Sequence, residues 1–308
     1  MAARFAWVLN LDADLELGAL AEGAARYEPR KGVRLAMKAQ VERVAASLLG
    51  PADILVDEAS PAGIAEGLRG RAFCPTPRAL ALLLRAGAEP EPHPPLQVLR
   101  RVNSRAFASS LGATMPGAAF VTAPAIARAM LREVPPVGSG WRVKHPFGMA
   151  GRNQRIFTPR AMDEPGDEGA LAFLRVGLAK GGVQIEPNVA IETEYAIHGM
   201  LAQSGSVVLG ALVRQRCDPH GAWLATEPIA DPRERQEEVA ERMTEEARTV
   251  ARALAGAGYF GPFGVDGYTY RDRAGVLRLQ TRSEINARYS MGFATGWGRP
   301  GGDSRAEG

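Results

Sequence analysis

The hexapeptide Ser283-Glu284-Ile285-Asn286-Ala287-Arg288, near the C-terminus, carries a carboxylate, an amide and a guanidinium at every second residue. Alternate side chains of a β-strand lie on one face, so Glu284, Asn286 and Arg288 would point the same way. Such a face suits a magnesium-bound polyphosphate, because Mg²⁺ prefers oxygen ligands and a planar guanidinium pairs with the remaining negative charge. An exposed strand with ordinary polar residues is the alternative interpretation, and the hexapeptide alone favours neither.

The composition is typical of a globular enzyme. The chain has 308 residues, of which 46% are hydrophobic and 23% charged, and this length predicts two or three compact units. The net charge of +3 comes without a block of Lys or Arg, so we expect no nucleic-acid partner. No membrane span or signal-peptide pattern is present. Cys74 and Cys217 lack CxxC spacing and the histidines are scattered singly, which disfavours a disulfide framework and a His-based zinc site and indicates a cytoplasmic protein.

The N-terminal part alternates strand and helix patterns. Apolar runs of strand length occur at 5–11, 53–57 and 71–74, and helical patterns at 35–49 and 77–85. This alternation predicts a small parallel α/β domain. The Pro-rich segment Glu89–Pro95 is expected to be a linker, so the first domain would cover residues 1–95.

The remaining chain predicts two α+β units and a tail. We expect a unit at 96–190, a unit at 191–298 and a disordered Gly-rich tail at 299–308. The helical patterns lie at 96–111, 124–133, 169–180 and 233–254, and the strand patterns at 118–122, 154–158, 183–187, 193–203, 206–216 and, as a hairpin, 263–285.

One glycine motif is rejected as a nucleotide site. Gly256–Gly261 matches GxGxxG, which binds a pyrophosphate only between a strand and the N-terminus of a helix. Here the predicted order is helix, glycines, strand, so the motif meets the wrong end of the helix. No GxxxxGK[ST] motif occurs, which disfavours a P-loop enzyme.

A lysine beside a Gly-rich turn is a second candidate. Only four of the 37 basic residues are lysine, and Lys144 precedes Gly148–Gly151. A Gly-rich hairpin can fold its amides over phosphates while the ammonium bridges phosphate oxygens. A simple β-turn with an exposed lysine is the alternative.

The order of these motifs resembles the ATP-grasp superfamily of carboxylate–amine and carboxylate–thiol ligases, over about residues 96–295. The resemblance rests on Asn103-Ser104-Arg105, Lys144, the strand Val183–Pro187 with Glu194 downstream, Asp266 and Glu284-x-Asn286-x-Arg288. It implies a small N-terminal parallel α/β domain followed by an ATP-grasp core of two α+β subdomains, with ATP between them.

The resemblance also implies a role for each residue. The metal ligands would be Asp266, Glu284 and Asn286, holding Mg²⁺ with Mn²⁺ as an alternative ion. Lys144 would contact the phosphates of the nucleotide, and Arg105 would take the place of a second family lysine. Gly148 and Gly151 would belong to a Gly-rich flap, the turn Gly148–Gly151, that covers the phosphates. Glu186 would lie at the adenine, Glu194 at the ribose, and Arg214 would be a further phosphate contact. Lys144 and Arg288 would act in catalysis, Arg288 by holding the transferring phosphate or an acyl-phosphate oxygen. For Glu186, Glu194 and Arg214 a purely structural role is the alternative.

The register of the last hairpin conflicts with this assignment. If Tyr270 pairs with Val276 across a simple turn, Asp266 lies opposite Gln280 and not opposite Glu284. A bulge or an asymmetric loop would bring the two acids together.

The implied activity is an ADP-forming ligation of a carboxylate to an amine through an acyl-phosphate. An amino acid or peptide is the expected substrate, and a homodimer is left open. Two alternatives are a small-molecule kinase on the same fold and a non-catalytic nucleotide-binding module.

Overall fold

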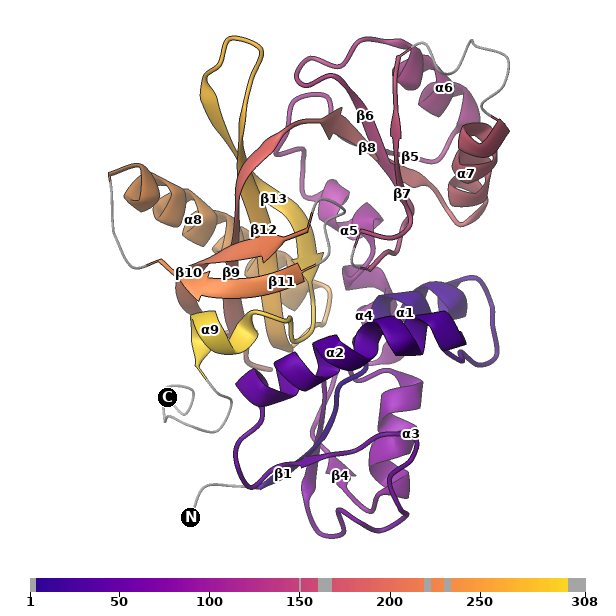
Figure 1. The fold of residues 1–308 in the computed structure, drawn as a ribbon, viewed down its shortest axis with the longest axis vertical. Coiled ribbons are helices and arrows are strands. Elements are labelled where there is room, and N and C mark those ends of the chain that lie inside the picture. The colour runs from indigo at the N-terminus through magenta and orange to yellow at the C-terminus, as the bar shows by residue number, and fades with distance from the viewer. Residues whose placement is uncertain (1–3, 150, 160–167, 219–222, 230–233, 299–308) are drawn as a thin grey trace.

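The computed structural model describes residues 4–149, 151–159, 168–218, 223–229 and 234–298. It contains three sheets, with strand orders β2-β1-β3-β4, β5-β8-β6-β7 and β11-β10-β9-β12-β13. The first sheet lies at the N-terminal end of the molecule, and the other two lie beside one another (Figure 1). The predicted 299–308 tail lies outside the described residues.

The N-terminal sheet is entirely parallel, as the sequence predicted. Its buried strand β1 and helix α3 share a core that includes Val8, Ala79 and Leu83. Helices α1 and α2 lie between this sheet and the rest of the molecule (Figure 1). The elements are β1 (Phe5–Val8), α1 (Ala13–Ala21), α2 (Lys31–Leu48), β2 (Ile54–Leu55), β3 (Arg69–Ala72), α3 (Pro77–Arg85) and β4 (Glu89–Pro90).

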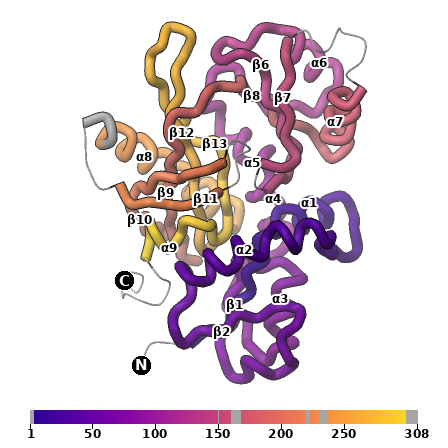
Figure 2. The backbone as a smooth tube through the Cα atoms, in the orientation of Figure 1, coloured from indigo at the N-terminus to yellow at the C-terminus, as the bar shows by residue number. Residues whose placement is uncertain are grey.

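The second sheet is antiparallel and is covered by α6 and α7, whose apolar residues pack on Trp141, Val143 and Phe157. The trace in Figure 2 shows this unit as the compact magenta lobe away from both termini. Its elements are β5 (Ala119–Val121), α6 (Pro124–Arg132), β6 (Gly140–Lys144), β7 (Gln154–Phe157), α7 (Glu168–Ala179) and β8 (Val183–Asn188). The preceding helices α4 (Leu96–Val102) and α5 (Arg105–Ser110) bury Leu99, Val102 and Phe107 in the core of the third sheet instead.

The third sheet has one apolar face, on which α8 packs through Met243, Ala247 and Val250. Its strands are antiparallel, and the opposite face carries the polar residues described below. The elements are β9 (Ile191–Leu201), β10 (Val207–Cys217), β11 (Trp223–Pro228), α8 (Glu234–Gly256), β12 (Gly261–Arg271), β13 (Leu277–Asn286) and α9 (Phe293–Trp297).

The predicted 96–111 helix is two helices in the structure. Ser104 ends the first and caps the second, since its Oγ accepts a hydrogen bond from the Phe107 amide at 3.2 Å. Asn103 bonds the backbone of Ala287, with its Oδ1 accepting from the Ala287 amide at 2.9 Å. The break therefore fixes the first residue of α5, Arg105, beside the end of β13.

Some short elements were absent from the prediction. These are α1, β11, α9 and the two-residue edge strand β4 within the expected linker. Pro90 is tolerated in β4 because an edge strand has one side free of ladder hydrogen bonds.

Asp266 and Glu284 lie directly opposite one another in the β12–β13 ladder. Two features produce this register. The turn pairs Arg271 with Leu277, which shifts the ladder from the simple-turn expectation, and a bulge between Asp266 and Tyr268 shifts it again. The structure thus adopts the bulged alternative and not the pairing of Asp266 with Gln280.

His198 lies in the core between β9 and α9, where its ring meets Phe293 edge-on. Neither ring nitrogen has a hydrogen-bond partner among the described residues, and burial lowers the pKa of His198 to about 4. In the unfolded chain the pKa of a histidine is near 6.5, so the folded state loses stability as the pH falls from about 6.5 to 4, by about 3 kcal/mol in total.

His198→Leu should therefore lose less stability in acid than the natural protein. Urea unfolding between pH 7 and pH 4 measures this difference, and the exposed His93→Gln is the control. Equal loss of stability in His198→Leu and the natural protein would show that His198 is not the acid-sensitive group.

Candidate functional site

The polar face of the five-stranded sheet gathers acids and amides from four adjacent strands. Glu194 lies on β9, Gln215 on β10, Asp266 on β12, and Glu284 with Asn286 on β13. The Asp266 carboxylate accepts hydrogen bonds at 2.8 Å from the amides of both Gln215 and Asn286. Glu284 and Asn286 share this face because they are two residues apart on one strand.

Asp266 has an unusual acidity in this setting. Burial, together with the neighbouring Glu284 carboxylate, raises the pKa of Asp266 to about 7, although the hydrogen bonds from Asn286 and Gln215 lower it. Two carboxylates held together in a partly buried site repel each other when both are ionised. A divalent cation between them would remove that repulsion.

Lys144 and Glu186 form a buried ion pair on the four-stranded sheet. The Lys144 Nζ lies 2.6 Å from the Glu186 Oε1, and Glu186 is 4% exposed. Lys144 ends β6 and Glu186 lies on the adjacent β8, so the two side chains meet across neighbouring strands. The ion pair holds the Lys144 ammonium in the cavity that the Gly-rich turn Gly148–Gly151 also lines.

Arg105 links three elements at the centre of the site. Its Nη2 lies 2.9 Å from the Glu284 Oε1, and its Nη1 donates to the His145 carbonyl oxygen at 2.8 Å. Gly148 is required beside it, because a Cβ there would lie 3.0 Å from the Arg105 Nη1 and 2.8 Å from the Arg152 carbonyl oxygen. A larger residue would therefore push the Gly-rich turn away from Arg105.

Arg288 is held by a residue of the N-terminal domain. The Arg288 Nη2 lies 2.6 Å from the Asp14 Oδ2, and the side chains are 11% and 7% exposed, respectively. The Arg288 Nη1 donates to the Tyr289 carbonyl oxygen at 3.1 Å. Asp14 lies in the first turn of α1, so this helix orients the guanidinium that follows β13.

A cavity of about 220 Å³ lies among these groups. Ten of the eleven predicted site residues line it, and Arg214 does not. Arg214 is exposed and alternates with Gln215, which lines the cavity, so Arg214 points to the opposite face of the sheet. The ten are Arg105, Lys144, Gly148, Gly151, Glu186, Glu194, Asp266, Glu284, Asn286 and Arg288.

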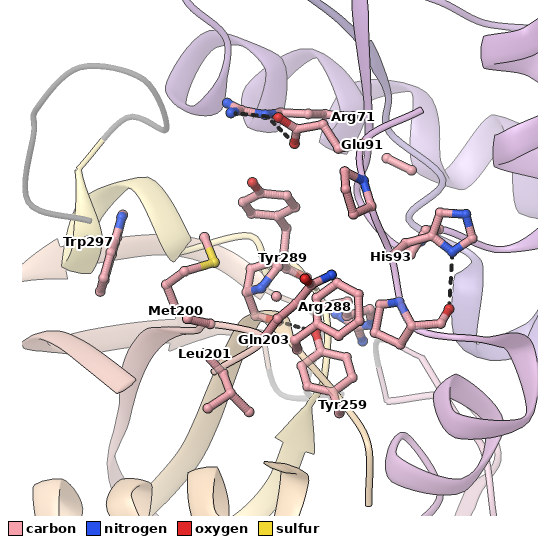
Figure 3. A pocket seen from close by; sticks show the side chains of 18 of the residues that line it. Arg71, Glu91, His93, Met200, Leu201, Gln203, Tyr259, Arg288, Tyr289 and Trp297 are labelled. Carbon is pink, nitrogen blue, oxygen red and sulfur yellow. Dashed lines mark hydrogen bonds and ion pairs between the residues drawn. The ribbon is translucent and has the colours of Figure 1, made fainter. Parts of the chain in front are cut away.

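A larger cavity, of about 870 Å³, lies between the N-terminal domain and the far end of the five-stranded sheet. Figure 3 shows the Arg71–Glu91 pair on one wall and Met200, Tyr289 and Trp297 on the other. Among the described residues, only Arg288 lines both cavities. The smaller cavity, and not the larger one, contains the paired acids and the buried lysine.

No protein-family model and no curated protein matches this chain. The biotin carboxylase of Campylobacter jejuni, solved as a β,γ-ATP complex, superposes with a TM-score of 0.55 at 13% identity, over 96% of this chain and 72% of its own. The biotin carboxylase domain of Hydrogenobacter thermophilus 2-oxoglutarate carboxylase, solved as a dimer with MgADP, ADP and bicarbonate, superposes with a TM-score of 0.52 at 14% identity, over 94% of this chain and 65% of its own. This chain has the ATP-grasp fold.

The ATP-grasp fold confirms the architecture that the order of the motifs predicted. Among the described helices, none combines the length and the apolar character that crossing a membrane requires. The described residues also contain no group of three or more His, Cys, Asp and Glu side chains suited to a metal. The candidate donor set instead consists of two carboxylates and the amide of Asn286.

Two functional candidates were missed at the level of sequence. Asp14 lies in α1, a helix that the sequence did not predict. Asp14 and Arg288 are also far apart along the chain, so no local sequence pattern indicates that they form an ion pair. Gln215 was overlooked in favour of its neighbour Arg214. Strand alternation could have indicated Gln215, since a residue that pairs with Glu194 across the ladder shares its face.

Proposed function

We propose that the protein is an ATP-dependent ligase that joins a carboxylate to an amine through an acyl-phosphate and releases ADP and phosphate. The observation that carries this proposal is the convergence of Asp266, Glu284, Asn286, Lys144 and Arg288 on one cavity. The adenine nucleotides in the biotin carboxylase structures of the same fold support it.

The residues fit a bound magnesium ion. Oxygen atoms of two carboxylates and one amide are the donors that Mg²⁺ prefers. Asp266 and Glu284 lie opposite one another, and their mutual repulsion contributes to the raised pKa of Asp266. Asp266 and Glu284 would therefore hold the ion as its anionic ligands, and the amide oxygen of Asn286 would be its neutral ligand.

The nucleotide would lie between the two core sheets. Lys144 and Arg105 would neutralise phosphate oxygens, while Gly148 and Gly151 allow the turn to approach them closely. Glu194 lies on β9 close to the connection from β8, a position that suits a ribose hydroxyl. Glu186 holds Lys144 in place and lies on the strand expected to meet adenine.

When bound, Mg-ATP supplies the phosphoryl group that activates the carboxylate. This chain supplies positioning and charge, since phosphoryl transfer requires little covalent chemistry from the protein. Arg288, held by Asp14, would stabilise the negative charge on the acyl-phosphate oxygens. Gly148, Met149 and Gly151 line the cavity and would exclude water from it.

An amino acid or a short peptide is the proposed carboxylate substrate. The Arg288–Asp14 ion pair lines the cavity, and so do the apolar side chains of Leu11, Phe73 and Met291. A charged carboxylate and an apolar side chain would both find partners there.

The test is ADP release with Mg-ATP across a panel of amino-acid pairs and dipeptides, followed by mass spectrometry of the products. A new amide with one ADP per product supports the proposal. A stable phosphorylated product without an amide would identify a kinase. Binding of ATP without ADP release for any acceptor would identify a non-catalytic module.

Asp14→Asn is expected to lower the rate of ADP release about tenfold to a hundredfold, because the variant removes the charge that orients Arg288. The exposed Asp57→Asn serves as the control. Steady-state kinetics should show the loss mainly in kcat, with little change in the KM for ATP. A loss confined to the KM for ATP would place Asp14 outside the reacting end of the site.

A further inference from the structure

We propose that Arg105 makes this site select the metal–nucleotide complex over the free metal ion. The inference rests on the proposed function, because it concerns the same candidate metal ligands. Arg105 pairs with the Glu284 carboxylate, and the phosphates of a bound nucleotide would compete with Glu284 for the guanidinium.

The contact places a fixed cation on a candidate metal ligand. The Arg105 Nη2 lies 2.9 Å from the Glu284 Oε1, and the Arg105 side chain is only 14% exposed. A divalent ion bound to Glu284 at this position would lie close to the guanidinium, and like charges repel strongly in a partly buried site. Free metal binding therefore requires Arg105 to move.

The Asp266 carboxylate also has its own hydrogen-bond partners within the protein. Both Asp266 carboxylate oxygens accept amide hydrogen bonds, from Gln215 and Asn286. Among the described residues that line the cavity, the charged side chains balance as well, with five acids against five bases. The acids are Asp14, Glu186, Glu194, Asp266 and Glu284, and the bases are Arg105, Arg142, Lys144, Arg152 and Arg288. A free dication therefore meets no net negative charge.

Arg105 retains an unused donor that a phosphate could satisfy. Its Nε is buried and has no hydrogen-bond partner among the described residues. The side chain lies under the Gly-rich turn at Gly148, where nucleotide phosphates are proposed to bind. A phosphate there would take Arg105 as a partner and release the Glu284 oxygen to the metal. Each ligand would then strengthen the binding of the other by the same factor.

The experiment is a Mn²⁺ titration followed by electron paramagnetic resonance, with and without a non-hydrolysable ATP analogue. In the natural protein, the analogue should tighten Mn²⁺ binding about tenfold or more. Arg105→Met should bind free Mn²⁺ about tenfold more tightly than the natural protein and gain less from the analogue. Arg105→Gln, which keeps a donor for the His145 carbonyl oxygen, repeats the test with a smaller disturbance of folding.

Arg142→Met is the matched control. Arg142 lines the same cavity, but its Nη2 donates to the Asn188 Oδ1 and not to a candidate metal ligand. If Arg142→Met and Arg105→Met tighten the binding of free Mn²⁺ equally, the cause is the loss of one positive charge from the cavity and not the Arg105–Glu284 contact. That result would overturn the inference. Unchanged Mn²⁺ binding in both Arg105 variants, with the analogue still effective, would overturn it and leave the proposed function standing. Absence of Mn²⁺ binding in every protein, even with the analogue, would overturn both.

Discussion

Glu284→Gln is expected to reduce ATP turnover by about a thousandfold or more, because it removes an anionic metal ligand from the phosphoryl-transfer site. The fold should survive, since the Glu284 side chain is 39% exposed and pairs with Arg105 at the edge of the cavity. The loss of the neighbouring charge also removes one cause of the raised pKa of Asp266. Single-turnover ADP release measures the loss of ATP turnover, and thermal unfolding measures whether the fold survives.

Glu227→Gln provides the control for Glu284→Gln. Glu227 lies on the edge strand β11 and pairs with Arg216 at the surface, so its neutralisation should leave both the rate and the stability nearly unchanged. ADP release by Glu284→Gln within tenfold of the natural rate would exclude Glu284 as a metal ligand. A large fall in melting temperature would assign the lost activity to misfolding.

The polar face of β13 could be predicted from sequence because strand periodicity is local. Glu284, Asn286 and Arg288 alternate along the chain, and the structure brings all three to the same cavity. Lys144 could be predicted for a similar reason, as a lone lysine beside a glycine-rich turn. The parallel N-terminal sheet followed from the alternation of short apolar runs and helical patterns.

The contacts that complete the site depend on long-range packing. Asp14 meets Arg288 across 274 residues, and no local pattern encodes that pairing. The Asp266–Glu284 register depends on a bulge between Asp266 and Tyr268, which the alternation of residue types along the two strands does not reveal. The break before Arg105 needed the Asn103 contact with Ala287, which lies far along the chain. Helical propensity alone therefore predicted one continuous helix.

Lys144→Met is expected to lower ATP turnover by about a thousandfold, because the ammonium is proposed to neutralise charge on the transferring phosphate. It should also destabilise the protein. Glu186 is 4% exposed and has Lys144 as its ion-pair partner at 2.6 Å, so the variant leaves a buried carboxylate without its cation. The double variant Lys144→Met/Glu186→Gln separates these effects, since it removes the unpaired charge and should recover stability without recovering ADP release.

Lys180→Met is the matched control for Lys144→Met. Lys180 pairs with Glu22 at 2.9 Å, but both side chains are substantially exposed, at 34% and 41%. A surface pair of this kind contributes little to stability, so Lys180→Met should keep both the melting temperature and the rate of ADP release. Recovery of activity in the double variant would show that Lys144 serves to neutralise Glu186 and does not act on the phosphate. Continued loss of activity at restored stability is the result that the proposed role requires.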